Sequence, residues 1–211
     1  MFAIVRKFSI LFMLVLGLLS TLAGKEKSPR DILKDVRDEY QSFETVCAEY
    51  TQTFHWTLAN EIRETNGKIC TKNGEKFRIN TSDQLIVTNG KTLWTVNKMN
   101  NQVLIDHANG DQDNPFLKSF YDTYLNHYHA EFCSENEENV CIILTAKQEG
   151  EFNKQVKLWV DHKDLIRKIE RTDINENRTV FEIISIDTDV PLPADTFVYE
   201  PEPDQEIIDL R

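Results

Sequence analysis

LIVTNGKTLWTVN, residues 85–97, holds two β-rich runs on either side of an Asn-Gly pair. Gly90-Lys91-Thr92 resembles the end of a phosphate-binding loop, but such a loop needs an earlier glycine and a helix that follows it. Residues 85–89 contain no glycine, and the residues that follow Thr92 are typical of a strand. Because Asn-Gly accepts the positive φ angles of a type I′ turn, the stretch predicts a β-hairpin and not a nucleotide site.

Further β-rich runs lie on both sides of this hairpin. Residues 46–58 alternate between apolar and polar side chains, which predicts a long strand with one largely apolar face. Turn signals such as Asn73-Gly74 separate the runs. The pattern predicts one α+β domain with a mainly antiparallel sheet of about eleven strands. The expected strands are residues 46–58, 62–71, 76–80, 84–88, 92–97, 102–106, 127–133, 140–146, 155–160, 165–171 and 179–186, with a tail around residues 197–199.

Two amphipathic helices are expected beside these strands. Ser28, Pro29 and Asp31 are typical of a helix start, and this helix is predicted over residues 29–42. Pro115 opens a second helix with aromatic side chains on one side. A curled sheet of more than about eight strands leaves internal space that such helices could plug or cap.

The apolar side of the predicted sheet and the second helix carry a set of large side chains. Any one of them alone is better explained as a core residue, whereas the whole set indicates an apolar cavity. The set consists of Tyr50, Phe54, Trp56, Ile69, Phe77, Ile79, Phe116 and Phe120.

The beginning of the chain has the pattern of a secretory signal peptide. Arg6 and Lys7 form a basic segment, residues 8–19 are almost entirely apolar, and small residues end the segment at Ala23. An uncleaved membrane anchor is the alternative, but the apolar run is short for a membrane span. We therefore expect residues 1–23 to be a signal peptide and residues 24–211 to form a single exported, soluble and monomeric domain.

The acidity of the chain restricts its partners. There are 24 Lys and Arg against 35 Asp and Glu, which gives a net charge of −11. Without Arg6 and Lys7 the balance is 22 against 35, or −13. Such a surface repels phosphate backbones and anionic lipid headgroups, so we expect no nucleic-acid partner.

Sequence templates for catalysis and metal binding do not match this chain. It has no GxSxG elbow, no HExxH motif and no glycine-rich dinucleotide fingerprint, so we expect no enzymatic activity and no cofactor. His127 and His129, at alternate positions of a predicted strand, are the best local candidates for a metal site. A solvated strand face explains them better, and no two cysteines have CxxC spacing, so we expect no metal.

The first two cysteines are expected to pair across a hairpin, because an oxidising compartment favours disulfides. A hairpin of the first two strands centred on residues 58–59 sets Cys47 opposite Cys70. The same register sets Glu49 opposite Lys68, which brings opposite charges together. Directly opposed residues have Cα atoms about 4.5–5.5 Å apart, a distance that suits a disulfide.

The other two cysteines flank a polar turn. Residues 134–139 centre a second hairpin that sets Cys133 opposite Cys141. The two registers together predict the disulfides Cys47–Cys70 and Cys133–Cys141. Four reduced thiols that pack as small side chains are the alternative.

Five short segments occur in an order that one known family shares. They are Tyr50-Thr51-Gln52, Lys76-Phe77-Arg78-Ile79, residues 84–97, Asn114-Pro115-Phe116-Leu117 and Phe197-Val198-Tyr199-Glu200-Pro201. The most specific is residues 84–97, in which Leu-Trp follows the Asn-Gly turn. The chain resembles the LolA family of periplasmic carriers that ferry lipoproteins to the outer membrane, over nearly all of residues 24–211.

The resemblance implies an open, incomplete β-barrel with a helical lid over a hydrophobic cavity for acyl chains. It implies a periplasmic chaperone that shields the acyl chains of lipoproteins and delivers them from the inner to the outer membrane. The implied partners are acylated lipoproteins, an inner-membrane lipoprotein-releasing transporter and an outer-membrane acceptor. A periplasmic sensor of lipids or lipoproteins similar to RseB, with no transport role, is the alternative.

One position departs from the family pattern. At the end of the second strand the family usually has Arg-Pro, whose arginine hydrogen-bonds the lid, whereas this chain has Asn73-Gly74. An asparagine has fewer donors and no charge. Asn73 is thus the lid-contact position by resemblance, and we expect a lid that opens more readily than in typical members. Arg63, on the same predicted face, is a weak candidate to substitute for the arginine.

Overall fold

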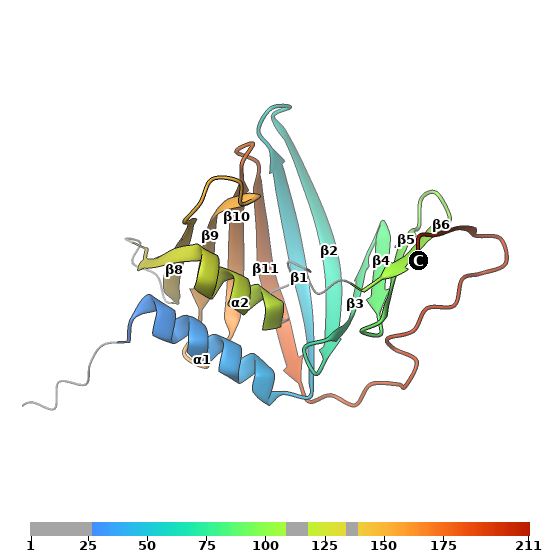
Figure 1. Cartoon of the computed structure of the whole chain (residues 1–211), viewed down its shortest axis with the longest axis horizontal. Helices are drawn as coiled ribbons and strands as arrows, with labels where there is room; N and C mark the ends of the chain where they lie inside the picture. The colour runs from blue at the N-terminus through green and yellow to red at the C-terminus, as the bar shows by residue number, and fades with distance from the viewer. Residues whose placement is uncertain (1–26, 109–117, 134–138) are drawn as a thin grey trace, which may run out of the picture.

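The computed structural model describes residues 27–108, 118–133 and 139–211, which form two helices and a twelve-stranded sheet (Figure 1). Three predictions fall outside these residues. They are the signal peptide of residues 1–23, the start of the second helix at Pro115 and Phe116, and most of the turn at residues 134–139.

The sheet is open and mainly antiparallel, as predicted for an α+β fold with an incomplete barrel. The strand order is β12-β6-β5-β4-β3-β2-β1-β11-β10-β9-β8-β7, so β12 and β7 are its two edges. All neighbouring strands are antiparallel except β12 and β6, which are parallel. The elements are α1 Pro29–Ser42, β1 Thr45–Trp56, β2 Glu61–Lys72, β3 Lys76–Thr81, β4 Gln84–Thr88, β5 Thr92–Asn97, β6 Gln102–His107, α2 Lys118–His127, β7 Tyr128–Phe132, β8 Val140–Ala146, β9 Asn153–Val160, β10 Ile166–Asp173, β11 Arg178–Thr188 and β12 Glu206–Asp209.

Two local predictions are wrong. Residues 197–199 are not a strand, and the last strand begins at Glu206 instead. A four-residue strand whose pairing is non-local leaves too short a pattern to be recognised in sequence. His127 is the last residue of α2, whereas His129 lies in β7, so the two imidazoles do not share the face of a strand.

The two helices lie over one half of the sheet (Figure 1). α1 begins with a capping box, in which the Asp31 N–H donates to Ser28 Oγ and the Ser28 N–H donates to the Asp31 carboxylate. The Arg30 guanidinium donates to the Leu125 carbonyl in the last turn of α2. A cation suits this end of a helix because the helix dipole is negative there. Among the described residues, neither helix is long and apolar enough to cross a bilayer.

The main core lies between the helices and the sheet face that they cover, which we call the inner face. Ile142, Leu158 and Ile169 of the sheet are fully buried in it. The rings of Phe120 and Tyr124 in α2 and of Tyr128 at the start of β7 follow one another, with centroids 4.5 and 4.6 Å apart. This aromatic row holds α2 against the sheet by contact with the apolar side chains below it.

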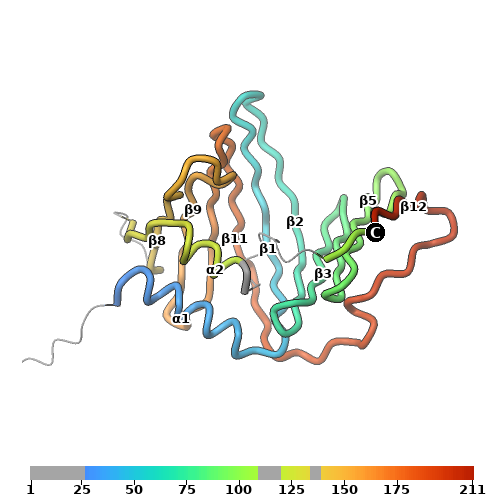
Figure 2. The backbone as a smooth tube through the Cα atoms, viewed as in Figure 1, coloured from blue at the N-terminus to red at the C-terminus, as the bar shows by residue number. Residues whose placement is uncertain are grey.

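A smaller core lies on the opposite, outer face of the sheet. It consists of Leu85, Val87, Trp94, Val96, Val103 and Ile105 on β4, β5 and β6. The chain after β11 runs past β3–β6 to reach β12 (Figure 2), and on the way Tyr199 packs against this core. The Arg78 guanidinium fixes the same segment by donating to the Thr196 carbonyl at 3.2 Å.

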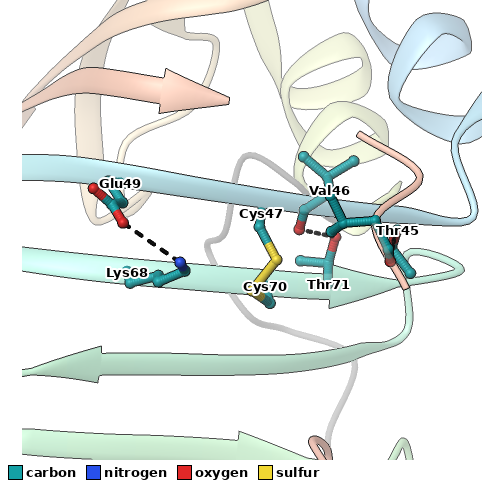
Figure 3. Close-up of a disulfide and its surroundings, with 8 residues drawn as sticks. Thr45, Val46, Cys47, Glu49, Lys68, Cys70 and Thr71 are labelled. Carbon is teal, nitrogen blue, oxygen red and sulfur yellow. Dashed lines mark hydrogen bonds and ion pairs between the residues drawn. A yellow bond between two sulfur atoms is a disulfide. The ribbon is translucent and has the colours of Figure 1, made fainter. Parts of the chain in front are cut away.

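Two disulfides cross hairpins and join the cysteine pairs that the sequence register predicts. Cys47–Cys70 joins β1 to β2 with Cα atoms 4.1 Å apart, and the Glu49–Lys68 ion pair lies beside it at 3.4 Å (Figure 3). Cys133, directly after β7, is bonded to Cys141 of β8, with Cα atoms 5.3 Å apart. The first bridge is central, because β1 also pairs with β11 and so connects the two halves of the sheet.

Gly67 allows the Tyr50 ring to lie close against β2 on the inner face. The two residues are paired across β1 and β2, and a Cβ added to Gly67 would lie 2.4 Å from Tyr50 Cζ. We expect Gly67→Ala to lower the free energy of unfolding by about 1–3 kcal/mol, because the ring must leave its packed position. Chemical denaturation measures this loss. In a Tyr50→Leu background the same change should cost much less, and an equal cost in both backgrounds would contradict the explanation.

Candidate functional site

The described members of the predicted cavity set all lie on the inner side of the fold. Tyr50, Ile69 and Phe120 belong to the main core, and Phe77 is buried on β3. The remaining described side chains are less covered: Phe54 and Ile79 are half-buried, and Trp56 is exposed at the end of β1. Phe116 lies outside the described residues. The set therefore divides into a packed floor and a more accessible part, and its acyl-binding role remains a prediction.

Beyond the main core, the inner face continues onto β3–β6 as an apolar row. Ile79 pairs with Ile86, Ile86 with Thr95, and Thr95 with Leu104, so the row crosses four strands. Leu93 lies on the same face of β5, two residues before Thr95. We call Ile79, Ile86, Leu93 and Leu104 the inner apolar surface.

The inner apolar surface is less covered than either core. All four of its side chains are half-buried, and Ile86, Leu93 and Leu104 belong to neither core. In Figure 1 the described helices lie over the other half of the sheet. The surface is therefore the part of the inner face that is chemically suited to an apolar ligand.

An arginine that the sequence analysis missed lies beside α2 on the inner face. Arg171 is paired with Val156, whose side chain is in the main core. Its guanidinium carbon is 5.9 Å from the centre of the Phe120 ring and 5.2 Å from that of Phe181. The signal for it was a charged residue two positions after Ile169, on the inward side of a predicted strand.

We expect Arg171→Met to loosen the Phe120 end of α2. The cation–π contacts that it removes are worth about 0.5–2 kcal/mol, so the free energy of local opening of α2 should fall by that order. Amide hydrogen exchange along α2 measures the change. Arg171→Lys retains a cation and should have a smaller effect, whereas unchanged exchange in the methionine variant would contradict the role.

Polar contacts fix the C-terminal end of α2. Lys147 Nζ donates to the Asn126 carbonyl at 2.6 Å, and the Lys147 N–H donates to the His127 carbonyl at 2.9 Å. The His127 Nδ1 atom lies 2.9 Å from a carboxylate oxygen of Glu151. His127 thus has a structural partner, and in the described part of the chain no three metal-binding side chains come together.

Asn73, the predicted lid-contact position, lies exposed in the turn between β2 and β3 with a φ of 53°. Its N–H donates to the Glu44 carbonyl at 2.9 Å, in the connection between α1 and β1. Arg63 is exposed on β2, opposite Phe54. The role of Asn73 in holding the lid remains a prediction.

A pocket and three tyrosine hydroxyls are further features that lie outside the inner apolar surface. A pocket of about 450 Å³ is formed by the loop between β8 and β9 and its neighbours, and contains none of the predicted cavity residues. On the inner side, burial raises the pKa of the Tyr40, Tyr50 and Tyr121 hydroxyls. These groups are neutral at physiological pH, so they suit an apolar ligand better than acid–base chemistry.

Solved structures match this chain at low sequence identity. An uncharacterised conserved protein from Thermus thermophilus is similar with a TM-score of 0.56 and 12% identity, over 85% of this chain and 98% of that chain. A LolA superfamily protein from Nitrosomonas europaea has a TM-score of 0.44 and 12% identity, over 82% and 98%. The MucA/MucB complex from Pseudomonas aeruginosa gives a TM-score of 0.42 and 9% identity, over 82% and 61%. The similarity to the Thermus thermophilus protein supports the fold, because its TM-score is above 0.5.

The family comparison is more specific. No curated protein matches the chain. The sequence model of the family described as outer membrane lipoprotein carrier protein LolA matches residues 41–200. These residues include β1 to β11, the inner apolar surface and the segment that crosses the outer core. The chain therefore belongs to the LolA family of outer membrane lipoprotein carrier proteins.

Proposed function

We propose that this protein is a periplasmic carrier that shields lipoprotein acyl chains and delivers them from the inner to the outer membrane. The observation that carries the proposal is the inner apolar surface, which is half-buried and continuous with the main core through Ile79. Membership of the family supports acylated lipoproteins as the cargo. The chain acts by binding and release, without enzymatic activity or a cofactor.

The energetics of an acyl chain explain why such a surface is suitable. Each CH₂ group left in water costs about 0.8 kcal/mol, so a long acyl chain costs about 12 kcal/mol in total. A carrier in water must hide this chain and must also give it up at its destination. A shallow surface beside a movable helix meets both needs, whereas a fully complementary pocket would retain the chain.

α2 is the proposed lid. Its C-terminal end is fixed by Lys147, His127 and Arg30, whereas Phe120 at its other end rests on the Arg171 guanidinium. A helix held at one end can pivot there, so displacement of the Phe120 end would widen the approach to the inner face. Asn73 in place of the family arginine favours this opening.

The proposed partners and location follow from the same role. Residues 1–23 would direct export, and two disulfides suit an oxidising compartment. A lipoprotein-releasing transporter in the inner membrane would load the carrier, and an acceptor in the outer membrane would unload it. The acidic surface favours a soluble monomer between the two.

Native mass spectrometry of the protein purified from a periplasmic extract tests the proposal. We expect a chain that begins near residue 24 and carries an acylated lipoprotein, which passes to outer-membrane vesicles on incubation. Retention of the lipoprotein in the presence of those vesicles would instead favour a sensor. A protein that is never recovered with acylated cargo would contradict both roles.

A further inference from the structure

The hairpin of β1 and β2 projects beyond its neighbours at one end of the sheet (Figure 1). Three large apolar side chains are exposed at its tip. Leu58 in the turn is 91% exposed, Ile62 is 69% exposed and Trp56 is 45% exposed. Trp56 lies on the inner face, whereas Ile62 is paired with His55 on the outer face. We call Trp56, Leu58 and Ile62 the apolar tip.

More apolar side chains lie at the same end of the sheet. The Thr57 N–H donates to Asn177 Oδ1 at 3.1 Å, which ties the hairpin to the turn between β10 and β11. Ile174 in that turn and Phe152 before β9 are both exposed, and the Ile174 N–H donates to the Phe152 carbonyl at 3.0 Å. The apolar tip is thus supported by its neighbours and flanked by further apolar surface.

A lipid bilayer fits this geometry better than a protein groove does. A groove contacts one face of a hairpin, whereas an inserted tip is surrounded by lipid. Here a large apolar side chain lies on each face and another in the turn. Tryptophan is enriched at membrane interfaces because its ring is apolar and its N–H remains hydrated. Glu61, Arg63 and Glu64 adjoin the tip, and their charges limit insertion to the interfacial region, where they stay in contact with water.

The charge of the chain selects the type of lipid. A net charge of −11 is repelled by an anionic surface. Insertion driven by apolar side chains alone needs no anionic headgroup, because the free energy comes from apolar area removed from water. A zwitterionic surface is therefore the favoured partner.

We propose that the apolar tip inserts into the interface of a zwitterionic bilayer and thereby brings the inner face of β1 to the membrane. The inference rests on the proposed carrier function. Tyr50, Phe54 and Trp56 follow one another on the inner side of β1, from the main core to the tip. An acyl chain that leaves the bilayer at the tip would meet these three aromatic side chains, with Gln52 between Tyr50 and Phe54, on its path to the main core.

Intrinsic fluorescence of the mature protein with phosphatidylcholine vesicles tests the inference. Trp94 and Trp159 are buried, so Trp56 is the exposed reporter among the three tryptophans. We expect a blue shift on addition of vesicles and quenching by lipids with brominated acyl chains. Leu58→Asp and Ile62→Asp should each reduce the partition coefficient about tenfold or more, since each replaces buried apolar area by a charge.

Ile184→Asp is the matched control. Ile184 is 64% exposed, close to the value for Ile62, but it lies at the bulge of β11 away from the tip. This variant should partition like the parent protein. Equal loss in all three variants, binding that requires anionic lipid, or binding only to membranes that contain protein would each overturn the inference.

Binding of a fluorescent fatty acid in solution separates this inference from the carrier function. Leu58→Asp should bind the fatty acid like the parent while losing its affinity for vesicles. If Leu58→Asp keeps both its fatty-acid binding and its affinity for vesicles, insertion of the tip is disproved and the carrier function stands. If the parent partitions as expected but binds no fatty acid, the carrier function fails and the inserted tip stands.

Discussion

Removal of the Cys47–Cys70 disulfide is expected to lower the free energy of unfolding by about 3 kcal/mol. The bridge closes a loop with a sequence separation of 23 residues, and loop closure restricts the unfolded chain. Both cysteines are buried, so the double variant Cys47→Ala and Cys70→Ala keeps the site apolar. Because β1 joins the two halves of the sheet, the loss should appear in the global unfolding transition measured by denaturant.

The second disulfide provides the control for this prediction. Cys133–Cys141 has a sequence separation of 8 residues, for which the same loop-entropy relation gives about 2.5 kcal/mol. It also joins β7 and β8 at the edge of the sheet. Its removal should therefore cost less than removal of the first bridge. A larger loss on removing Cys133 and Cys141 would show that loop length and central position do not decide the effect.

Ile86→Asp is expected to weaken binding of a fluorescent fatty acid by about a hundredfold or more, because an ionised carboxylate would face the acyl chain. Ile86 lies near the middle of the inner apolar surface, between Ile79 and Leu104 in the row across the strands. Its side chain is half-buried. The aspartate should therefore remain hydrated in the unliganded protein, so binding falls much more than stability.

Isothermal titration of the variant and of two controls measures this effect. Ile86→Leu retains an apolar side chain and should bind within a few-fold of the parent. Ile184→Asp introduces the same charge at an exposed position outside the inner face, and should also bind normally. If Ile86→Asp is folded by circular dichroism and binds the fatty acid normally, the β4 part of the inner apolar surface does not contact the acyl chain.

The strand pattern and the first hairpin could be predicted because local signals agree there. In the register of β1 and β2, Glu49 meets Lys68 and Ala48 meets Ile69, and the structure has this register. A shift by one residue would have moved every apolar side chain to the wrong face. The cysteines occupy opposed positions in that same register, so their pairing could be read from the sequence.

The inner apolar surface could not be assigned from the sequence in the same way. Leu85, Ile86 and Val87 are consecutive apolar residues, so alternation does not tell which of them faces inward. The structure resolves this because Leu85 and Val87 belong to the outer core, against which Tyr199 packs. That contact joins segments more than a hundred residues apart, and only the tertiary fold brings them together. Arg171 was missed for a similar reason, since its aromatic partners come from α2 and β11.

Photo-crosslinking with a long-chain fatty acid that carries a terminal diazirine tests the central claim most directly. After irradiation, the modified residues are located by tandem mass spectrometry, because side chains of the inner apolar surface and of the outer core alternate along the same peptides. We predict modification at Ile79, Ile86, Leu93 or Leu104, with competition by unlabelled fatty acid. Saturable labelling confined to the pocket between β8 and β9, or to the outer core, would contradict an acyl-binding inner face.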